Sequence, residues 1–87
     1  MFAIIRGVNS GVHAGTVVSH QGTEVTLKDS RRLWYWEAKG GVALSGLSQL
    51  GLKKGKIDTL VPNLTVLDAC EIIECSETAR NSILNHE

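Results

Sequence analysis

The stretch RRLWYWEAKGG, residues 31–41, decides the fold, because it holds both tryptophans and the only tyrosine of the 87-residue chain at three consecutive positions. In an extended strand, alternate side chains face opposite ways, which gives two sets: Arg31, Leu33 and Tyr35, and Arg32, Trp34 and Trp36. Neither set is polar, although a strand with one solvated face normally alternates apolar with polar residues. We therefore expect cover on both sides. The domain's own core would supply one cover, and a curved sheet, a second subunit or a ligand the other.

The residues before this stretch indicate more strands. Val25 and Leu27 alternate with polar neighbours, which is typical of a strand with one buried face. Gln21-Gly22 predicts a tight turn before it, and Asp29-Ser30 predicts a turn after it. Four strands are thus predicted, at residues 2–8, 16–20, 23–28 and 31–36.

After the aromatic stretch the pattern becomes helical. Residues 42–51 carry apolar side chains at helical spacing: Ala43, Leu44, Leu47 and Leu50. The KKGK sequence at 53–56 predicts an exposed turn. Beyond it we expect an edge strand at 57–61 ended by Pro62, a longer strand over 64–75, either continuous or bent near Asp68, and a last helix with Ser76 as its N-cap.

This order of elements predicts a single α+β domain over residues 1–87. Its sheet would be small, curved and mostly antiparallel, with about five strands, one inserted helix and a C-terminal helix. A chain of this length is near the size at which a single core leaves a monomer only marginally stable, so we expect a homo-oligomer. No apolar run approaches the roughly 20 residues that span a bilayer, and the first residues do not resemble a secretion signal. We therefore expect a cytoplasmic protein without membrane contact.

Charge is unevenly distributed along the chain, although the net charge is zero. Through Lys56 there are eight basic and three acidic residues, a balance of +5, and from Ile57 onward there are one basic and six acidic residues, a balance of −5. The two halves can pair with each other, within one domain or between subunits, or they can leave a basic face for an anionic ligand. The neutral total disfavours binding to duplex nucleic acid.

Cysteine and histidine residues give no sign of a metal site. Cys70 and Cys75 are five residues apart, so in a strand they would face opposite sides and could not form a disulfide with each other. The three histidines stand at no recognisable ligand spacing from them. We expect buried free thiols, no metal and no cofactor.

Two stretches could bind a ligand. In GVHAG, residues 11–15, two glycines allow a turn whose backbone N–H groups cradle an anion, with His13 at its tip to contact a phosphate; the alternative is a plain hairpin loop. In the aromatic strand, Trp34 or Trp36 could stack on a base while Arg31 or Arg32 pairs with a phosphate. The alternative there is core packing together with a contact between subunits.

Motifs for catalysis are absent from the sequence. It contains no P-loop, no catalytic serine motif, no paired-carboxylate signature and no dinucleotide-binding fingerprint. No set of acid, base and nucleophile can be assembled, so we expect no enzyme activity.

The chain resembles a family of short phage and prophage proteins. The matching residues lie in the GVHxG turn (Gly11, Val12, His13 and Gly15), in the RR[LI]WxW strand (Arg31, Arg32, Leu33, Trp34 and Trp36) and in the closing strand (Glu71, Ile72, Ile73 and Glu77). The Trp-x-Gly-Ala that follows the aromatic strand in that family is replaced here by EAKGGVAL. The resemblance implies a virus in a bacterial host, and small phage accessory proteins often disable host defence.

Two functions follow as hypotheses. The first is a non-enzymatic, homo-oligomeric sponge that withholds a nucleotide-like anionic signal from host defence, with His13, Arg31, Arg32, Trp34 and Trp36 as ligand-binding residues. The second is a protein-binding inhibitor of a host defence enzyme or nuclease.

Overall fold

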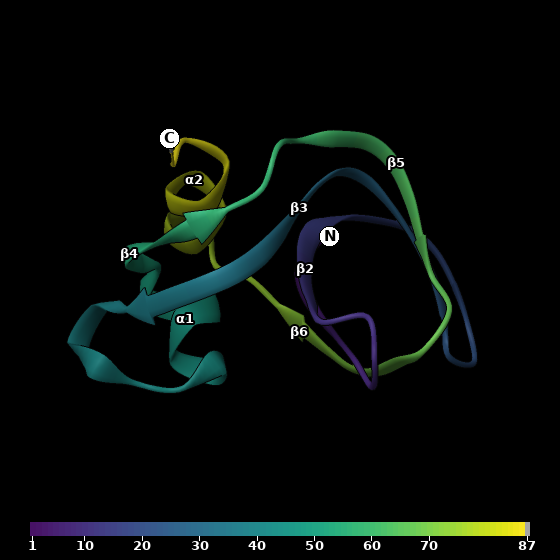
Figure 1. Ribbon diagram of the computed structural model, residues 1–87, viewed down its shortest axis with the longest axis horizontal. Helices are drawn as coiled ribbons and strands as arrows, with labels where there is room; N and C mark the ends of the chain where they lie inside the picture. The colour runs from purple at the N-terminus through teal and green to yellow at the C-terminus, as the bar shows by residue number, and fades with distance from the viewer. Residues whose placement is uncertain (87) are drawn as a thin grey trace.

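The computed structural model describes residues 1–86 and contains six strands and two α-helices (Figure 1). The elements are β1 (Phe2–Gly7), β2 (Val12–Gln21), β3 (Glu24–Ala38), a 3-10 turn η1 (Lys39–Gly41), α1 (Leu44–Leu50), β4 (Leu52–Ile57), β5 (Val61–Val66), β6 (Ala69–Glu74) and α2 (Glu77–Leu84). All strand pairs are antiparallel.

The sheet is built around the long strand β3. Its order is β4-β3-β2-β1-β6, and β5 also pairs with β3. β2 lies along one edge of β3, whereas β5 and β4 share the other edge, β5 beside the first half and β4 beside the second. In Figure 1 the strands β2, β3, β5 and β6 curl round, and α1 and α2 lie to one side with β4. The predicted α+β fold with a curved antiparallel sheet, an inserted helix and a C-terminal helix is confirmed.

Strand β1 is buried on both faces, which explains its unbroken apolar sequence. Phe2 and Ile4 pack into the cluster beneath the helices, together with Leu33, Leu47 and Ile83; we call it the helix-side cluster. Alternate residues of β1 point into a second cluster inside the curved sheet, made up of Ala3, Ile5, Val25, Leu27, Val66 and Ala69. Because both faces exclude water, the period-two alternation of polar residues is missing here.

The turn predicted at Asp29-Ser30 is wrong, because both residues belong to β3, which continues beyond them. Between the pairs Ala14–Arg31 and Thr16–Lys28, these two residues stand opposite the single residue Gly15. Asp29 has a φ of 53°, a conformation that aspartate tolerates better than most residues. The turn-like sequence therefore marks a β-bulge that bends the strand without reversing it.

The predictions for residues 53–75 were also partly wrong. KKGK is not a turn but belongs to β4, whose Leu52 is buried in the helix-side cluster. A Cβ on Gly55 would lie 2.5 Å from the Tyr35 carbonyl oxygen, so this glycine permits close strand contact. Pro62 does not end a strand at 57–61 but lies within β5, opposite the bulged Asp29 where the ladder is interrupted. The strand predicted over 64–75 is divided at residues 67–68 into β5 and β6.

The two helices follow their predicted positions. α1 ends at Gly51, which has a φ of 90°. Ser76 is the N-cap of α2, since its Oγ accepts a hydrogen bond from the Ala79 N–H at 3.1 Å. Ile83 on α2 is fully buried against the sheet.

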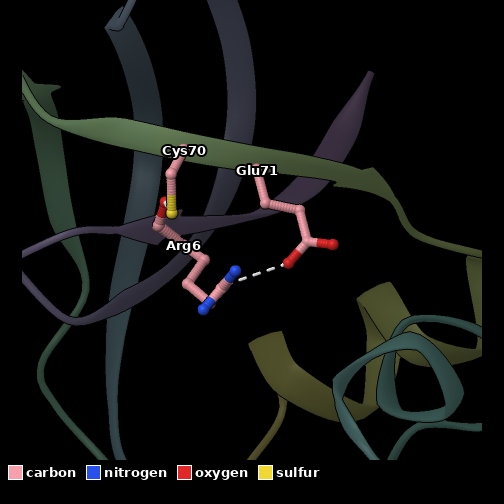
Figure 2. Close-up of polar contacts among 3 residues, drawn as sticks. All are labelled: Arg6, Cys70 and Glu71. Carbon is pink, nitrogen blue, oxygen red and sulfur yellow. Dashed lines mark hydrogen bonds and ion pairs between the residues drawn. The ribbon is translucent and has the colours of Figure 1, made fainter.

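One ion pair joins the basic and acidic halves of the chain. Arg6 Nε lies 3.0 Å from Glu71 Oε1, between register partners on β1 and β6 (Figure 2). Beside it, Cys70 Sγ donates to the Arg6 carbonyl oxygen at 3.2 Å. Both charged side chains are exposed, and such a pair contributes roughly 0 to 1 kcal/mol. It therefore contributes little to the stability of the fold.

Within residues 1–86, no helix combines the length and the apolar character needed to cross a membrane.

Candidate functional site

His13 does not stand at the tip of a turn, as the sequence predicted. It lies in β2, between its register partners Ile5 on β1 and Arg32 on β3, and its side chain is only 1% exposed. The turn comes earlier, where the Gly7 N–H donates to the Gly11 carbonyl oxygen at 2.8 Å and Gly11 has a φ of 92°. Because β2 already begins at Val12, His13 lies within the sheet. Its register partner on β1 is Ile5, which belongs to the cluster inside the curved sheet.

Trp34 and Trp36 are on different faces, contrary to the predicted alternation. Leu33 pairs with Ile57 and Tyr35 with Lys56, so Trp34 is an extra residue in β3, a second bulge. Trp34 is 68% exposed, and Tyr35 beside it is 49% exposed. Trp36 instead packs against the helix-side cluster that contains Leu33. The bulge thus assigns one tryptophan to the core and presents the other to solvent.

Arg31 and Arg32 also have separate roles. The Arg31 guanidinium donates to three carbonyl oxygens, those of Asp58 at 2.8 Å, Ile83 at 2.9 Å and His86 at 2.5 Å. Two of these carbonyls belong to the C-terminal end of α2 and the residues after it, so Arg31 caps that helix. Arg32 is exposed, and no hydrogen bond or ion pair with another group of residues 1–86 holds its guanidinium.

Arg32 lies where three adjoining hollows meet. Their volumes are about 410, 280 and 130 Å³, and Arg32 lines all three; we call them together the Arg32 groove. His13 lines the first and the third, and Trp34 lines the second. The largest hollow has an apolar wall from β5 and the residue after it, including Leu64, Val66 and Leu67. Three of the five predicted ligand-binding residues therefore gather at one groove, whereas Arg31 and Trp36 lie elsewhere.

At one end of the groove, Asp68 accepts hydrogen bonds from the loop that contains Asn9 and Ser10. Its Oδ2 accepts the N–H groups of Asn9 at 2.7 Å and Ser10 at 2.9 Å, and its Oδ1 accepts the Ser10 hydroxyl at 2.6 Å. These hydrogen bonds, the Ser10 hydroxyl first, hold the pKa of Asp68 below its ordinary value. Ser10 Oγ also lies 3.2 Å from His13 Nε2. The order carboxylate, hydroxyl, imidazole differs from a catalytic triad, in which the imidazole lies between the other two groups.

Asp58 lies at the other end of the groove. Its carboxylate accepts the Thr59 N–H at 2.8 Å and the Trp34 indole Nε1–H at 3.3 Å, which orients the exposed ring. The Thr59 hydrogen bond is the main reason why the pKa of Asp58 is lowered, and the nearby Arg32 contributes. Within residues 1–86, the groove therefore contains a cation without a hydrogen-bonding or ion-pair partner, Arg32, flanked by two carboxylates that are already hydrogen-bonded.

Residues 2–83 match the family described as Domain of unknown function (DUF6948). The chain belongs to this family. No curated protein and no solved structure matches the DUF6948 chain significantly. The family description names no activity for the DUF6948 domain.

Some groove residues of the DUF6948 chain were missed in the sequence analysis. The sequence marks Asp58 only as a charge of the acidic half, and Asp68 as such a charge and as a possible bend in the strand over 64–75. The residues Asn9, Ser10 and Gly11 are of types that favour a turn, but nothing local indicates that Asp68, 58 residues beyond Ser10, receives hydrogen bonds from this loop. The apolar wall from Leu64 to Leu67 was predicted as strand without a groove beside it.

Metal ligands do not converge in the part of the DUF6948 chain that the structure describes: no three side chains of His, Cys, Asp or Glu in residues 1–86 are grouped to hold an ion. The two cysteines are both free thiols, and burial raises the pKa of Cys75 to about 11.

Proposed function

We propose that this chain is a non-enzymatic binding protein that holds a small, nucleotide-like anion in the Arg32 groove. One observation carries the proposal. An exposed guanidinium without a protein partner in residues 1–86 lines three adjoining hollows, of which a buried imidazole lines two and an exposed indole the other. Guanidinium groups recognise phosphate through a planar, permanently charged fork, and indoles stack on bases.

The shape of the groove suggests how such a ligand would lie. A planar base would enter the largest hollow, against Leu64 and Val66 of β5, and its phosphate would extend outward to Arg32. Trp34 lines the adjoining hollow and could cover a second ring or the sugar. Stacking of a base on an aromatic side chain contributes about 1 to 3 kcal/mol.

The flanking carboxylates limit the charge of the ligand. Asp58 and Asp68 lie on either side of Arg32, so a highly charged polyphosphate would be repelled by two anions while meeting one cation. A nucleoside monophosphate, or a cyclic nucleotide with one charge per phosphate, suits this balance better than a triphosphate.

The biological part of the proposal is sequestration. In the cytoplasm of a bacterial host, a phage-encoded homo-oligomer with one groove per subunit would lower the free concentration of a signalling nucleotide without chemistry. The adjacent exposed side chains of Trp34 and Tyr35 offer apolar area that a second subunit could cover.

Thermal shift and tryptophan fluorescence against a panel of linear and cyclic nucleotides test the proposal. A ligand at 100 times its Kd stabilises the fold by about 2.7 kcal/mol, which corresponds to a rise in Tm of roughly 10 to 20 °C for a domain of this size. Arg32→Ala should abolish the rise, whereas Arg80→Ala, which removes an exposed arginine away from the groove, should preserve it. If no nucleotide raises the Tm of the unaltered protein, the proposal is refuted.

A second function is favoured by the same exposed pair of aromatic residues. Trp34 and Tyr35, at the bulge in β3, could be the anchor of a protein-binding surface, because buried aromatic side chains dominate many interfaces. The chain would then act as an inhibitor of a host defence enzyme or nuclease. This alternative predicts that Trp34→Ala abolishes capture of one host protein while every nucleotide leaves the Tm unchanged.

A further inference from the structure

The hydrogen bonds at the end of the groove determine which nitrogen of His13 carries a proton. The Asp68 carboxylate accepts three hydrogen bonds, from the Asn9 N–H, the Ser10 N–H and the Ser10 hydroxyl. Because these contacts lower the pKa of Asp68, the group is an ionised acceptor near neutral pH. The single hydroxyl proton of Ser10 is therefore committed to Asp68.

Ser10 Oγ can then only accept from His13. The two atoms His13 Nε2 and Ser10 Oγ are 3.2 Å apart, so Nε2 must be the protonated ring nitrogen. Burial lowers the pKa of His13, and the positive charge of Arg32 lowers it further, against the weaker opposing effects of Asp68 and of the Ser10 backbone. The imidazole is accordingly neutral near pH 7, with the lone pair on Nδ1.

This lone pair has no partner among residues 1–86. His13 Nδ1 is buried and accepts no hydrogen bond, although buried polar atoms nearly always have a partner. His13 lines two hollows of the Arg32 groove, and Arg32 and Leu64 line the same two. Arg32 is the exposed member of these three, so its movement toward a ligand anion would open the way to His13.

We propose that Nδ1 of His13 accepts a hydrogen bond from the ligand, so that the ligand must present an N–H or O–H donor on its buried part. This inference rests on the proposed function and narrows the ligand class to nucleotides whose base presents an N–H donor, such as an exocyclic amine. It also reverses the role predicted from the sequence, because a phosphate oxygen would meet the lone pair of Nδ1 and be repelled. Arg32 remains the phosphate contact, and His13 selects the base.

The state of the imidazole can be measured without a ligand. In protein labelled with ¹⁵N at histidine, NMR should identify His13 as the neutral tautomer with the proton on Nε2. Ser10→Ala removes the acceptor of that proton and should shift His13 toward the other tautomer. Finding the proton on Nδ1 in the unaltered protein would overturn the inference.

Binding experiments test the selection of the base. AMP and CMP are compared with purine riboside 5′-monophosphate and the 2-pyrimidinone nucleotide, which lack only the exocyclic amine. We expect AMP or CMP to bind about tenfold more tightly than its amine-free counterpart, and His13→Phe to abolish this difference by weakening only the amine-bearing nucleotide. Ser10→Ala, in which His13 is present but differently protonated, should also reduce the difference, and this keeps the test valid if His13→Phe does not fold.

The outcomes separate the two proposals. Equal binding of the paired nucleotides to the unaltered protein would overturn the role of His13 but would leave a nucleotide-binding groove. Absence of binding by all four nucleotides, together with the wider panel, would overturn the proposed function and the inference with it.

Discussion

Replacing Arg31 by alanine should destabilise the protein strongly, whereas the same change at the adjacent Arg32 should not. Arg31 donates three hydrogen bonds to carbonyl oxygens, two of them at the C-terminal end of α2 and just beyond it, and Arg32 donates none to residues 1–86. The two substitutions remove the same atoms from neighbouring positions of one strand. Their difference therefore isolates the capping contacts.

The magnitude follows from those contacts. A hydrogen bond that involves a charged group contributes about 1.5 to 3 kcal/mol. Because the three bonds share one half-exposed side chain and water can reach the carbonyls once it is gone, we take the loss for Arg31→Ala as about 2 to 3 kcal/mol rather than three times the single value. For a domain of this size, this loss lowers the Tm by roughly 8 to 24 °C.

Urea denaturation followed by tryptophan fluorescence measures this loss. Trp36 reports on the folded core because it packs against the helix-side cluster. Arg31→Ala should lower the urea midpoint with an unchanged slope, Arg31→Lys should lie between it and the unaltered protein, and Arg32→Ala should fall within about 0.5 kcal/mol of the unaltered protein, as for other surface changes. If Arg31→Ala and Arg32→Ala unfold at the same urea concentration, the capping role of Arg31 is refuted.

Three further predictions concern single groups. Ser76→Ala should cost about 1 kcal/mol in urea denaturation through loss of the α2 N-cap, and an unchanged midpoint would contradict that role. In native protein at pH 8, a thiol reagent should modify the exposed Cys70 rapidly and Cys75 only after unfolding, since burial raises the pKa of Cys75 to about 11; rapid reaction of both thiols would contradict this. The pKa of His13 is lowered from 6.5 in the folded state, so the unfolded chain binds the proton more readily, and stability should be constant above about pH 7 and fall as the pH drops below 6.5. The urea midpoint should thus be lower at pH 5.5 than at pH 7.5, and His13→Phe should reduce the difference; the lowered pKa of Asp68 acts only in more acidic solution.

The strands that could be predicted are those whose local pattern agrees with their surroundings. The run at residues 2–8 is apolar because β1 is buried on both faces, and the alternation of Val25 and Leu27 matches one buried face of β3. Ser76 is recognisable because N-caps depend on a side chain and a backbone N–H three residues apart. Each of these signals is complete within a few residues of sequence.

The errors arose where long-range pairing overrides the local pattern. KKGK resembles a turn, yet β4 forms because its backbone pairs with β3 and Ser82 on α2 binds the Leu52 N–H at 2.8 Å. The bulges at Asp29 and Trp34 each insert a residue into β3, and a one-residue shift moves every following side chain to the other face. This is why the expected pairing of Trp34 with Trp36 on one face was wrong, although the strand itself was predicted.

The groove depends on the same shift of register. The bulge at Asp29 sets which residue of β3 stands opposite His13, and that residue is Arg32, while its neighbour Arg31 stands opposite Ala14 and reaches the end of α2. If the same residues paired without this bulge, Ser30 would stand opposite Ala14 and Arg31 opposite His13, so Arg31 would no longer reach the end of α2 and the helix would lose its cap. The bulge that bends β3 therefore also directs Arg31 to the end of α2 and Arg32 to the groove, so the curvature of the fold and the composition of the groove have one structural origin.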